Sequence, residues 1–341
     1  MFRILVVGCG MMSDAWIEIA GRRDDCVIVG LVDPNINKAN EKKEKYNLLA
    51  NTYSNLTEAL EKEDANLVFD ISPPEIHFNT VTTALKAGCN VFGEKPMSDE
   101  LENAEKMVSC ADETKREYFV MQNRRYIPRI HALKNFLHSQ ELGKIGQISA
   151  NFQLDPHFGG FREEMNSPLI ADMAIHTFDA ARFITGKNPV SVYCHEFNPS
   201  WSWYKGNASA VCIFEMEDGL VFDYRGSWCA NGLNTSWESE WRIACTKGSV
   251  FWDGDEKLYY DLTADGVTKT GISAENEIIS SIKEIEPTPM EIEGHAACIG
   301  EMFEALKNGT RPQTDCRDNI NSIRMVQKAI QSARERKVIN L

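Results

Sequence analysis

One stretch near the beginning of the chain decides the fold, and it reads Ile4-Leu5-Val6-Val7-Gly8-Cys9-Gly10-Met11-Met12-Ser13. Four apolar residues in a row are typical of a strand that is buried on both faces of a parallel sheet. Two glycines follow where a chain that leaves a strand and enters a helix must turn tightly. Backbone N–H groups at the N-terminus of such a helix bind phosphate groups well. The stretch therefore predicts a strand, a glycine turn and a helix that bind a dinucleotide pyrophosphate.

The alternation of strand and helix continues to about residue 122. Further strands are predicted over four short apolar runs, Val27–Val32, Leu67–Ile71, Asn90–Phe92 and Tyr118–Met121. Helices are predicted between them, for example over Ile76–Lys86 and Leu101–Lys115. Repeated units of this kind give a doubly wound parallel sheet with right-handed crossovers. We therefore predict an α/β fold whose residues 1–122 form a dinucleotide-binding Rossmann domain.

The pattern changes from residue 123 onward. Helices are predicted over Pro128–Leu142, Pro168–Ile184, Gly294–Asn308 and Arg317–Arg336. Strands are predicted over Ile145–Leu154, Val190–Glu196, Ser209–Met216, Leu220–Ser227, Glu238–Thr246 and Ser249–Trp252. Consecutive strands joined by short turns indicate antiparallel pairing. We expect residues 123–341 to form an α+β domain with a large, mostly antiparallel sheet that binds substrate and supports oligomerisation.

Composition excludes several classes of protein. At 341 residues the chain is long for one hydrophobic core, and its net charge of -14 disfavours nucleic acid as a partner. No apolar run approaches the roughly 20 residues of a membrane span, and the first apolar stretch is too short for a signal peptide. The ten cysteines contain no CxxC pair and no metal-ligand spacing. We therefore expect free thiols, no metal, and a reducing cytoplasm as the location.

Asp33 follows the predicted strand Val27–Val32 and indicates which dinucleotide binds. A carboxylate at this point accepts hydrogen bonds from the ribose hydroxyls and repels a 2′-phosphate. The next residues, Pro34–Asn37, include no arginine or lysine, so NAD is favoured over NADP. The alternative is an ordinary glycine turn in which Asp33 only caps the loop that follows.

Lys95, Asp172 and His176 are the candidate catalytic residues. Lys95 directly follows the predicted strand Asn90–Phe92, and ligands bind beyond the carboxyl ends of strands in open sheets. Asp172 and His176 are four residues apart on a predicted helix and so share one face. Histidine transfers protons well near neutral pH, and a nearby carboxylate raises its basicity. Each residue taken alone also has a simple structural explanation, as a solvated lysine or as a pair on a helix face.

The whole chain resembles the Gfo/Idh/MocA family of oxidoreductases, in its inositol dehydrogenase-like branch. The resemblance is carried by Gly8-Cys9-Gly10, Asp33, Ser72-Pro73-Pro74 with His77, Glu94-Lys95-Pro96, and Asp172 with His176. It implies that Lys95 contacts the substrate, that Asp172 and His176 act with it at the reacting hydroxyl, and that nicotinamide lies between the domains. The resemblance also implies the following contacts with the cofactor: Gly8, Cys9, Gly10, Met11, Met12, Asp33, Ser72, Pro73, His77, Glu94 and Lys95. The sequence departs from the family at Ser13, where a third glycine is usual, and over Asn166–Ala171, where a glycine-rich stretch is common.

Further residues are candidates for contact with the substrate. An arginine in the loop Asp155–Arg162 or in the pair Arg124-Arg125 suits the carboxylate of a sugar acid, although a structural ion pair explains either arginine equally well. The substrate-binding candidates are Lys95, Asn123, Arg125, His157, Asp172 and His176. Five tryptophans, Trp201, Trp203, Trp228, Trp237 and Trp241, suit either a sugar-binding surface or, for most of them, packing.

The expected activity is that of an NAD-dependent dehydrogenase acting on a CH–OH group of a sugar, polyol or sugar acid. His176 is expected to accept the hydroxyl proton, Lys95 to stabilise the oxygen and Asp172 to orient His176. Three alternatives remain: an epimerase or glycosidase that uses NAD without net redox, a non-catalytic NAD sensor, and a metal site at Asp172 and His176. We also expect a homodimer or homotetramer, because one face of the large sheet needs covering.

Overall fold

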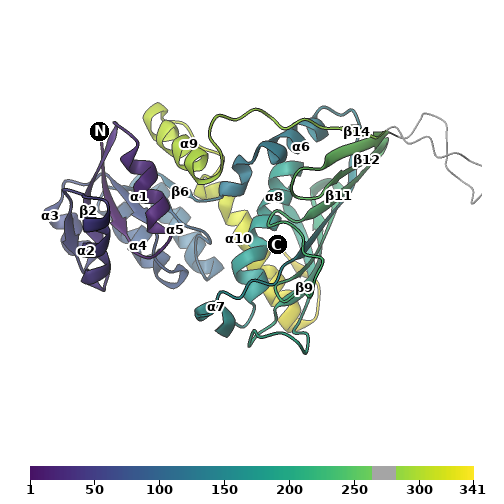
Figure 1. Cartoon of the computed structure of the whole chain (residues 1–341), viewed down its shortest axis with the longest axis horizontal. Coiled ribbons are helices and arrows are strands. Elements are labelled where there is room, and N and C mark those ends of the chain that lie inside the picture. Colours follow the sequence, from purple (N-terminus) through teal and green to yellow (C-terminus); the bar gives the residue numbers. More distant parts are fainter. Residues whose placement is uncertain (263–281) are drawn as a thin grey trace, which may run out of the picture. The chain divides into compact units, whose positions relative to one another are not determined.

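The computed structural model describes residues 1–262 and 282–341, and the chain forms two compact units (Figure 1). Residues 1–126 and 292–323 form the first unit, and residues 127–291 and 324–341 form the second. The predicted domain boundary at residue 122 stays a prediction. A late segment of the chain nevertheless packs with the first unit, which a single boundary does not anticipate.

The first unit contains a six-stranded parallel sheet in the order β3-β2-β1-β4-β5-β6. Its strands are β1 (Phe2–Val7), β2 (Cys26–Val32), β3 (Asn51–Tyr53), β4 (Leu67–Asp70), β5 (Asn90–Gly93) and β6 (Tyr118–Val120). The strand order reverses between β1 and β4, and dinucleotides bind at the carboxyl edge of such a switch point. The predicted Rossmann sheet is confirmed. Only β3 was not predicted, because three residues with one buried side chain, Tyr53, give no recognisable hydrophobic pattern.

Helices cover this sheet, and one of them comes from the far end of the sequence. The helices are α1 (Ser13–Gly21), α2 (Ile36–Lys45), α3 (Leu56–Lys62), α4 (Pro74–Lys86), α5 (Leu101–Thr114), the short η1 (Asn123–Tyr126) and α9 (Gly294–Asn308). Phe303 of α9 contacts the rings of Phe2, Phe69 and Phe92, with ring centroids 5.1, 6.1 and 5.2 Å away. These buried aromatic contacts hold α9 on the sheet.

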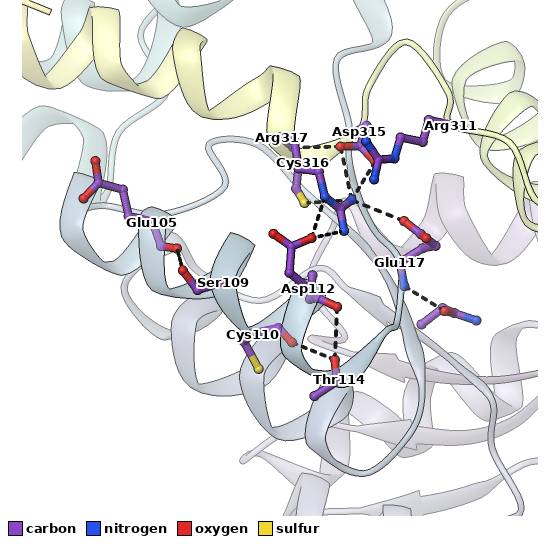
Figure 2. Close-up of polar contacts among 12 residues, drawn as sticks. Glu105, Ser109, Cys110, Asp112, Thr114, Glu117, Arg311, Asp315, Cys316 and Arg317 are labelled. Atoms are coloured by element: carbon purple, nitrogen blue, oxygen red, sulfur yellow. Dashed lines mark hydrogen bonds and ion pairs between the residues drawn. The ribbon is translucent and has the colours of Figure 1, made fainter.

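A charged cluster fixes the residues that lead into α10 (Cys316–Glu335) (Figure 2). Arg317 donates to Asp112 at 2.7 Å and to Asp315 at 3.0 Å, and its guanidinium lies 3.3 Å from Glu117. Asp315 is only 4% exposed as a residue and pairs with Phe119 in an isolated bridge beside β6. The cluster therefore joins α5, β6 and the beginning of α10 within the first unit.

The second unit is built on a nine-stranded sheet in the order β14-β13-β12-β11-β7-β10-β9-β8-β15. Its strands are β7 (Ile145–Gln153), β8 (Pro189–Phe197), β9 (Ser209–Met216), β10 (Val221–Ser227), β11 (Glu240–Cys245), β12 (Gly248–Trp252), β13 (Leu258–Leu262), β14 (Lys283–Glu284) and β15 (Ile339–Asn340). All neighbours are antiparallel except β7 and β10, which confirms the predicted, mostly antiparallel sheet. The unpredicted strands β13, β14 and β15 are short and lie toward its two edges.

One face of this sheet carries the helices α6 (Pro128–His138) and α8 (Ile175–Thr185) (Figure 1). Phe178 of α8 lies against Phe214 and Tyr224, with ring centroids 4.9 and 5.2 Å away. The remaining short helices of the unit are α7 (Phe161–Glu164), η2 (Leu169–Ala174) and η3 (Glu217–Gly219). In the described part of the chain, no helix has both the length and the apolar character needed to cross a membrane.

Two predicted helices differ from the structure. The helix predicted over Pro128–Leu142 ends at His138, because Gln140 has a φ of 64° and the Ser139 hydroxyl bonds to the Phe136 carbonyl. The helix predicted over Pro168–Ile184 begins instead as a π-helix, η2, and becomes α-helical only at Ile175. The apolar pattern of the two helix types is too similar for the sequence to distinguish them.

Candidate active site

The glycine turn after β1 has the geometry that its sequence predicts. Gly8 has a φ of 91°, and a Cβ on it would lie 2.5 Å from the Ile71 carbonyl oxygen, so only glycine fits. A Cβ on Gly10 would meet no described atom within 4 Å, which leaves this backbone open to a ligand. Ser13, in place of the usual third glycine, is fully buried and donates from its hydroxyl to the Gly10 carbonyl at 2.6 Å. The turn is thus closed by a local hydrogen bond.

Asp33 lies at the end of β2, beside this turn. Its two carboxylate oxygens accept the backbone N–H groups of Cys9 at 3.0 Å and Asn35 at 2.9 Å. Burial, and then the charge of Asp33, raise the pKa of the Cys9 thiol to about 12, so the thiol is neutral. The side chains of Met11 and Met12 are exposed at the beginning of α1. An open glycine backbone, a helix N-terminus and a fixed carboxylate fit a dinucleotide.

Lys95 follows β5 at the same edge of the sheet, and Glu94 fixes the backbone before it. One oxygen of the Glu94 carboxylate accepts the indole N–H of Trp16 at 2.8 Å, and the other accepts the backbone N–H of Lys95 at 3.1 Å. Trp16 is fully buried in α1, the helix that follows the glycine turn. The peptide bond between Lys95 and Pro96 is cis.

His77 of α4 contacts the residue after Lys95 and the residues that follow β4. One ring nitrogen, Nε2, is 2.7 Å from the Ser72 carbonyl oxygen, and the other, Nδ1, is 3.0 Å from the Pro96 carbonyl oxygen. The residue is 1% exposed, so its ring is engaged inside the first unit. Pro73, by contrast, is exposed beside the buried Ser72.

In the second unit, Asp172 lies in η2 and His176 lies one turn later, in α8. The Nε of Arg162 donates to Asp172 at 2.6 Å, and the side chain of Asp172 is 13% exposed. His176 is 8% exposed. π-helical turns recur at functional sites in proteins. The structure thus places the two residues in consecutive helical elements, η2 and α8, and adds an arginine as a direct partner of Asp172.

An aromatic wall, which we define as His157, Phe158, Phe161 and Trp203, belongs to the same unit as Asp172. His157 stacks on Trp203 with ring centroids 3.6 Å apart. The guanidinium of Arg162 lies 5.3 Å from the ring centroid of Phe158 and 4.8 Å from that of Phe161. Phe158 and Phe161 are 52% and 60% exposed. Aromatic faces that remain open beside charged groups suit the apolar side of a sugar ring.

The other substrate candidates, Asn123 and Arg125, belong to η1 in the first unit. Arg125 is 5% exposed and donates to Asp318 at 2.7 Å and to the Gln313 carbonyl. The Nδ2 of Asn123 lies 3.5 Å from the His295 ring. For Arg125 the geometry is that of the structural ion pair that the sequence left open as an alternative.

Comparison with known protein families agrees with the fold of both units. Residues 2–122 match the model "Oxidoreductase family, NAD-binding Rossmann fold", and residues 130–251 match "GFO/IDH/MocA C-terminal domain". The chain belongs to the Gfo/Idh/MocA oxidoreductase family. It is therefore an NAD(P)-dependent dehydrogenase, and its first unit is an NAD-binding Rossmann domain.

Several relatives illustrate the range of this family. The chain is 28% identical over 196 residues to a myo-inositol 2-dehydrogenase of Thermotoga maritima, covering 56% of this chain and 57% of the relative. It is 24% identical to a D-apiose dehydrogenase of Paraburkholderia graminis, covering 100% and 90% of the two chains. The fold matches an oxidoreductase from Agrobacterium radiobacter solved with NAD+, L-tartaric acid and magnesium, with a TM-score of 0.84, 17% identity and coverage of 99% and 98%.

Two residues of this Gfo/Idh/MocA protein, Trp16 and Glu196, were not found from the sequence as parts of the site, and the pairing of Arg162 with Asp172 was not predicted. Trp16 and Arg162 contact Glu94 and Asp172 only through the fold, across 78 and 10 residues of sequence. Glu196 of β8 accepts the Ser167 hydroxyl at 3.0 Å, just before η2, and burial raises its pKa to about 7. Arg162 itself was a candidate from the sequence, because it is the arginine of the loop already favoured for the substrate, whereas Trp16 and Glu196 gave no signal. Among the described residues, no group of three His, Cys, Asp or Glu is arranged to bind a metal ion.

Proposed function

We propose that this dehydrogenase uses NAD to oxidise a hydroxyl group of a sugar, polyol or sugar acid, with Lys95, Asp172 and His176 at the reacting oxygen. One observation carries the proposal. The glycine turn and the Lys95 turn meet at a single edge of the sheet, because Ile71 and Ser72 abut Gly8 while His77 joins Ser72 to Pro96. Ligands bind at this edge of such a sheet, so a lysine placed there lies close to the expected position of the bound dinucleotide and its substrate.

The residues of the first unit account for binding of the cofactor. The backbone of Gly8 and Gly10 and the N-terminus of α1 would bind the pyrophosphate, flanked by Met11 and Met12. Asp33 would accept the ribose hydroxyls, and its charge favours NAD over NADP. When bound, NAD supplies the hydride-accepting carbon of the reaction.

Side chains of the protein itself take up the hydroxyl proton and stabilise the reacting oxygen. His176 accepts the hydroxyl proton as a general base, and Asp172 orients the ring. Lys95 donates a hydrogen bond to the same oxygen and stabilises the negative charge that develops on it. Arg162, which bonds to Asp172, fixes that carboxylate.

The substrate class rests on relatives and on the second unit. The relatives named above act, by their names, on myo-inositol and D-apiose. The aromatic wall suits a sugar ring. The Nε of Arg162 bonds to Asp172, and the two terminal nitrogens of its guanidinium suit a carboxylate on that ring. We therefore place polyols, sugars and their acids together as the candidates.

The experiment is a screen of NAD reduction against inositols, hexoses, pentoses and the corresponding acids, followed by Lys95→Ala. We expect turnover to fall about 100-fold or more in Lys95→Ala, while NAD affinity stays nearly unchanged. Lys106→Ala is the control, because Lys106 is an exposed lysine whose ion pair with Glu102 lies within one helix, α5. Equal turnover in Lys95→Ala and Lys106→Ala contradicts the assignment. Product without NADH accumulation, with cofactor retained, identifies redox cycling instead.

We also propose that the protein is a homo-oligomer, formed through the face of the nine-stranded sheet opposite α8. Tyr193, Phe197, Val211 and Ile213 are each at least 41% exposed there. A hollow of about 420 Å³ on the sheet is lined by residues of both charges, among them Asp223, Arg225, Glu240 and Arg242. A surface that carries both charges can pair with itself about a two-fold axis.

Light scattering of Ile213→Glu tests this interface. We expect a lower mass than for the native chain, whereas Leu49→Glu, at a fully exposed leucine of the first unit, leaves the mass unchanged. An unchanged mass in Ile213→Glu contradicts the interface.

The ten free thiols further favour a reducing cytoplasm as the location.

A further inference from the structure

His77 makes two hydrogen bonds that a neutral imidazole cannot make together. Both of its ring nitrogens face carbonyl oxygens, Ser72 O at 2.7 Å and Pro96 O at 3.0 Å, and a carbonyl oxygen only accepts. A neutral ring has one N–H and one lone pair, whereas the imidazolium has two N–H groups. We propose that His77 is held as an imidazolium that donates to both carbonyls, and that it acts with Glu94 as a positioning residue for Lys95. The inference rests on the proposed role of Lys95.

The charges around the ring agree with a cation. Asp70 at the end of β4 is fully buried, and its Oδ1 accepts both the hydroxyl and the backbone N–H of Ser72. Burial raises the pKa of this carboxyl, the nearby charge of His77 lowers it, and the charge of Glu94 raises it. Asp70 thus interacts electrostatically with both His77 and Glu94 inside the first unit. A buried charge is costly unless it is paired, so the carboxyl of Asp70 beside the ring favours the protonated form of His77.

The phenol of Tyr118 also interacts electrostatically with Asp70. Burial raises its pKa well above 10, with the charge of Asp70 adding to that effect, so Tyr118 is neutral and contributes no compensating charge.

Glu94 and His77 hold the two sides of the Lys95 backbone. Glu94 accepts the Lys95 N–H on one side and is itself fixed by the indole of Trp16. His77 bonds to the carbonyl of Pro96 on the other side, and its second bond, to Ser72, reaches the strand end against which Gly8 packs. The two side chains therefore tie the Lys95 turn to the cofactor-binding turn. A displacement of about 1 Å at a reacting group lowers the rate about 100-fold. We therefore expect loss of these hydrogen bonds to lower turnover more than it lowers the affinity for NAD.

Nitrogen NMR of the full chain labelled with ¹⁵N-histidine tests the charge directly, without substrate or cofactor. At about pH 7.5 a free histidine is mostly neutral. For His77 we expect both ring nitrogens at the protonated shift. The seven histidine signals are assigned by the signal lost in His77→Gln or, if that variant does not fold, by substituting the other histidines one at a time. One nitrogen at the unprotonated shift overturns the proposal.

Kinetics of His77→Gln test the positioning role. Glutamine donates from one nitrogen only, so one of the two carbonyls loses its donor. We expect kcat to fall about 10- to 100-fold while the Kd for NAD changes less than about threefold. Thr82→Val is the matched control, because it removes a hydrogen bond to the Phe78 carbonyl on the same helix but does not touch the Lys95 turn. Equal kcat in His77→Gln and Thr82→Val overturns the positioning role.

Lys95→Ala, measured in the same assay, separates this inference from the proposed function. If Lys95→Ala turns over normally, the proposed function fails, and the NMR result still decides the charge of His77. If Lys95→Ala is inactive while His77→Gln matches Thr82→Val, the proposed function stands and the positioning role of His77 is refuted.

Discussion

Replacement of Gly8 by alanine tests the geometry of the cofactor turn most directly. The residue has a φ of 91°, and the left-handed region costs an L-residue about 1–2 kcal/mol. The added Cβ would also lie 2.5 Å from the Ile71 oxygen, 2.6 Å from its carbonyl carbon and 2.8 Å from the Ser72 nitrogen. All three atoms are backbone, so no side chain can rotate away to relieve the contact.

The backbone on both sides of that contact is fixed. Gly8 donates to the Val32 carbonyl, and Ile71 donates to the Val7 carbonyl, both at 2.8 Å. Relief of the clash must therefore move β1 relative to β4, and overpacking of this kind costs about 1–3 kcal/mol. The sum is about 2–5 kcal/mol, a large part of the typical 5–15 kcal/mol that stabilises a folded domain. For a domain of this size we expect Tm to fall by about 5–15 °C.

Thermal unfolding followed by circular dichroism, with and without NAD, measures this effect, and Gly10→Ala is the control. A Cβ on Gly10 meets nothing within 4 Å among the described atoms, so we expect Tm within about 1–2 °C of the native value. Its affinity for NAD is nevertheless expected to fall about tenfold or more, because the methyl group occupies the approach to the open backbone. A native Tm for Gly8→Ala, or an equal loss in both variants, would refute the reasoning.

Three further predictions concern cofactor choice, pH and the charged cluster. Asp33→Asn keeps a side-chain acceptor but removes the charge, so binding titrations with NAD and NADP should show the preference for NAD falling about tenfold or more. An unchanged ratio of the two dissociation constants means that Asp33 does not select the cofactor. Burial raises the pKa of Glu196 from 4.5 to about 7, so the folded state favours its protonated form. Urea unfolding should show native stability falling between about pH 4.5 and pH 7 by at most about 3 kcal/mol relative to Glu196→Gln, and parallel pH profiles contradict this. Arg317→Ala should lower the free energy of unfolding by about 1–3 kcal/mol, because it leaves the buried Asp315 without its nearest cation. Arg311→Ala removes a 63% exposed side chain 3.9 Å from Asp315 and should lower the free energy of unfolding by less than about 0.5 kcal/mol. Equal losses in the two variants refute the role of the cluster.

The sequence predicted most of the first sheet because its signals are local. An apolar run, a glycine turn and a helix each depend on residues within a few positions of one another, as in Ile4–Ser13. Only β3 was missed, since a strand of three residues carries too few positions for a pattern. The same local signals placed Lys95 after β5 and put Asp172 and His176 on one helical segment.

The tertiary structure decided what depends on distant residues. Phe303 brings α9 back to the first sheet, the Trp16 indole reaches Glu94, and Arg162 reaches Asp172. Such contacts produce no periodic pattern in the sequence, because each is a single hydrogen bond or ring contact between two segments that have separate local patterns. His77 shows the difference most clearly. The resemblance to a family implied a cofactor contact for it, and that contact stays a prediction. The fold places a carbonyl oxygen at each of its two ring nitrogens, and its proposed charge rests on this arrangement. The sequence thus determined which residues stand at strand ends and helix faces, and the folded chain decided which groups they bind.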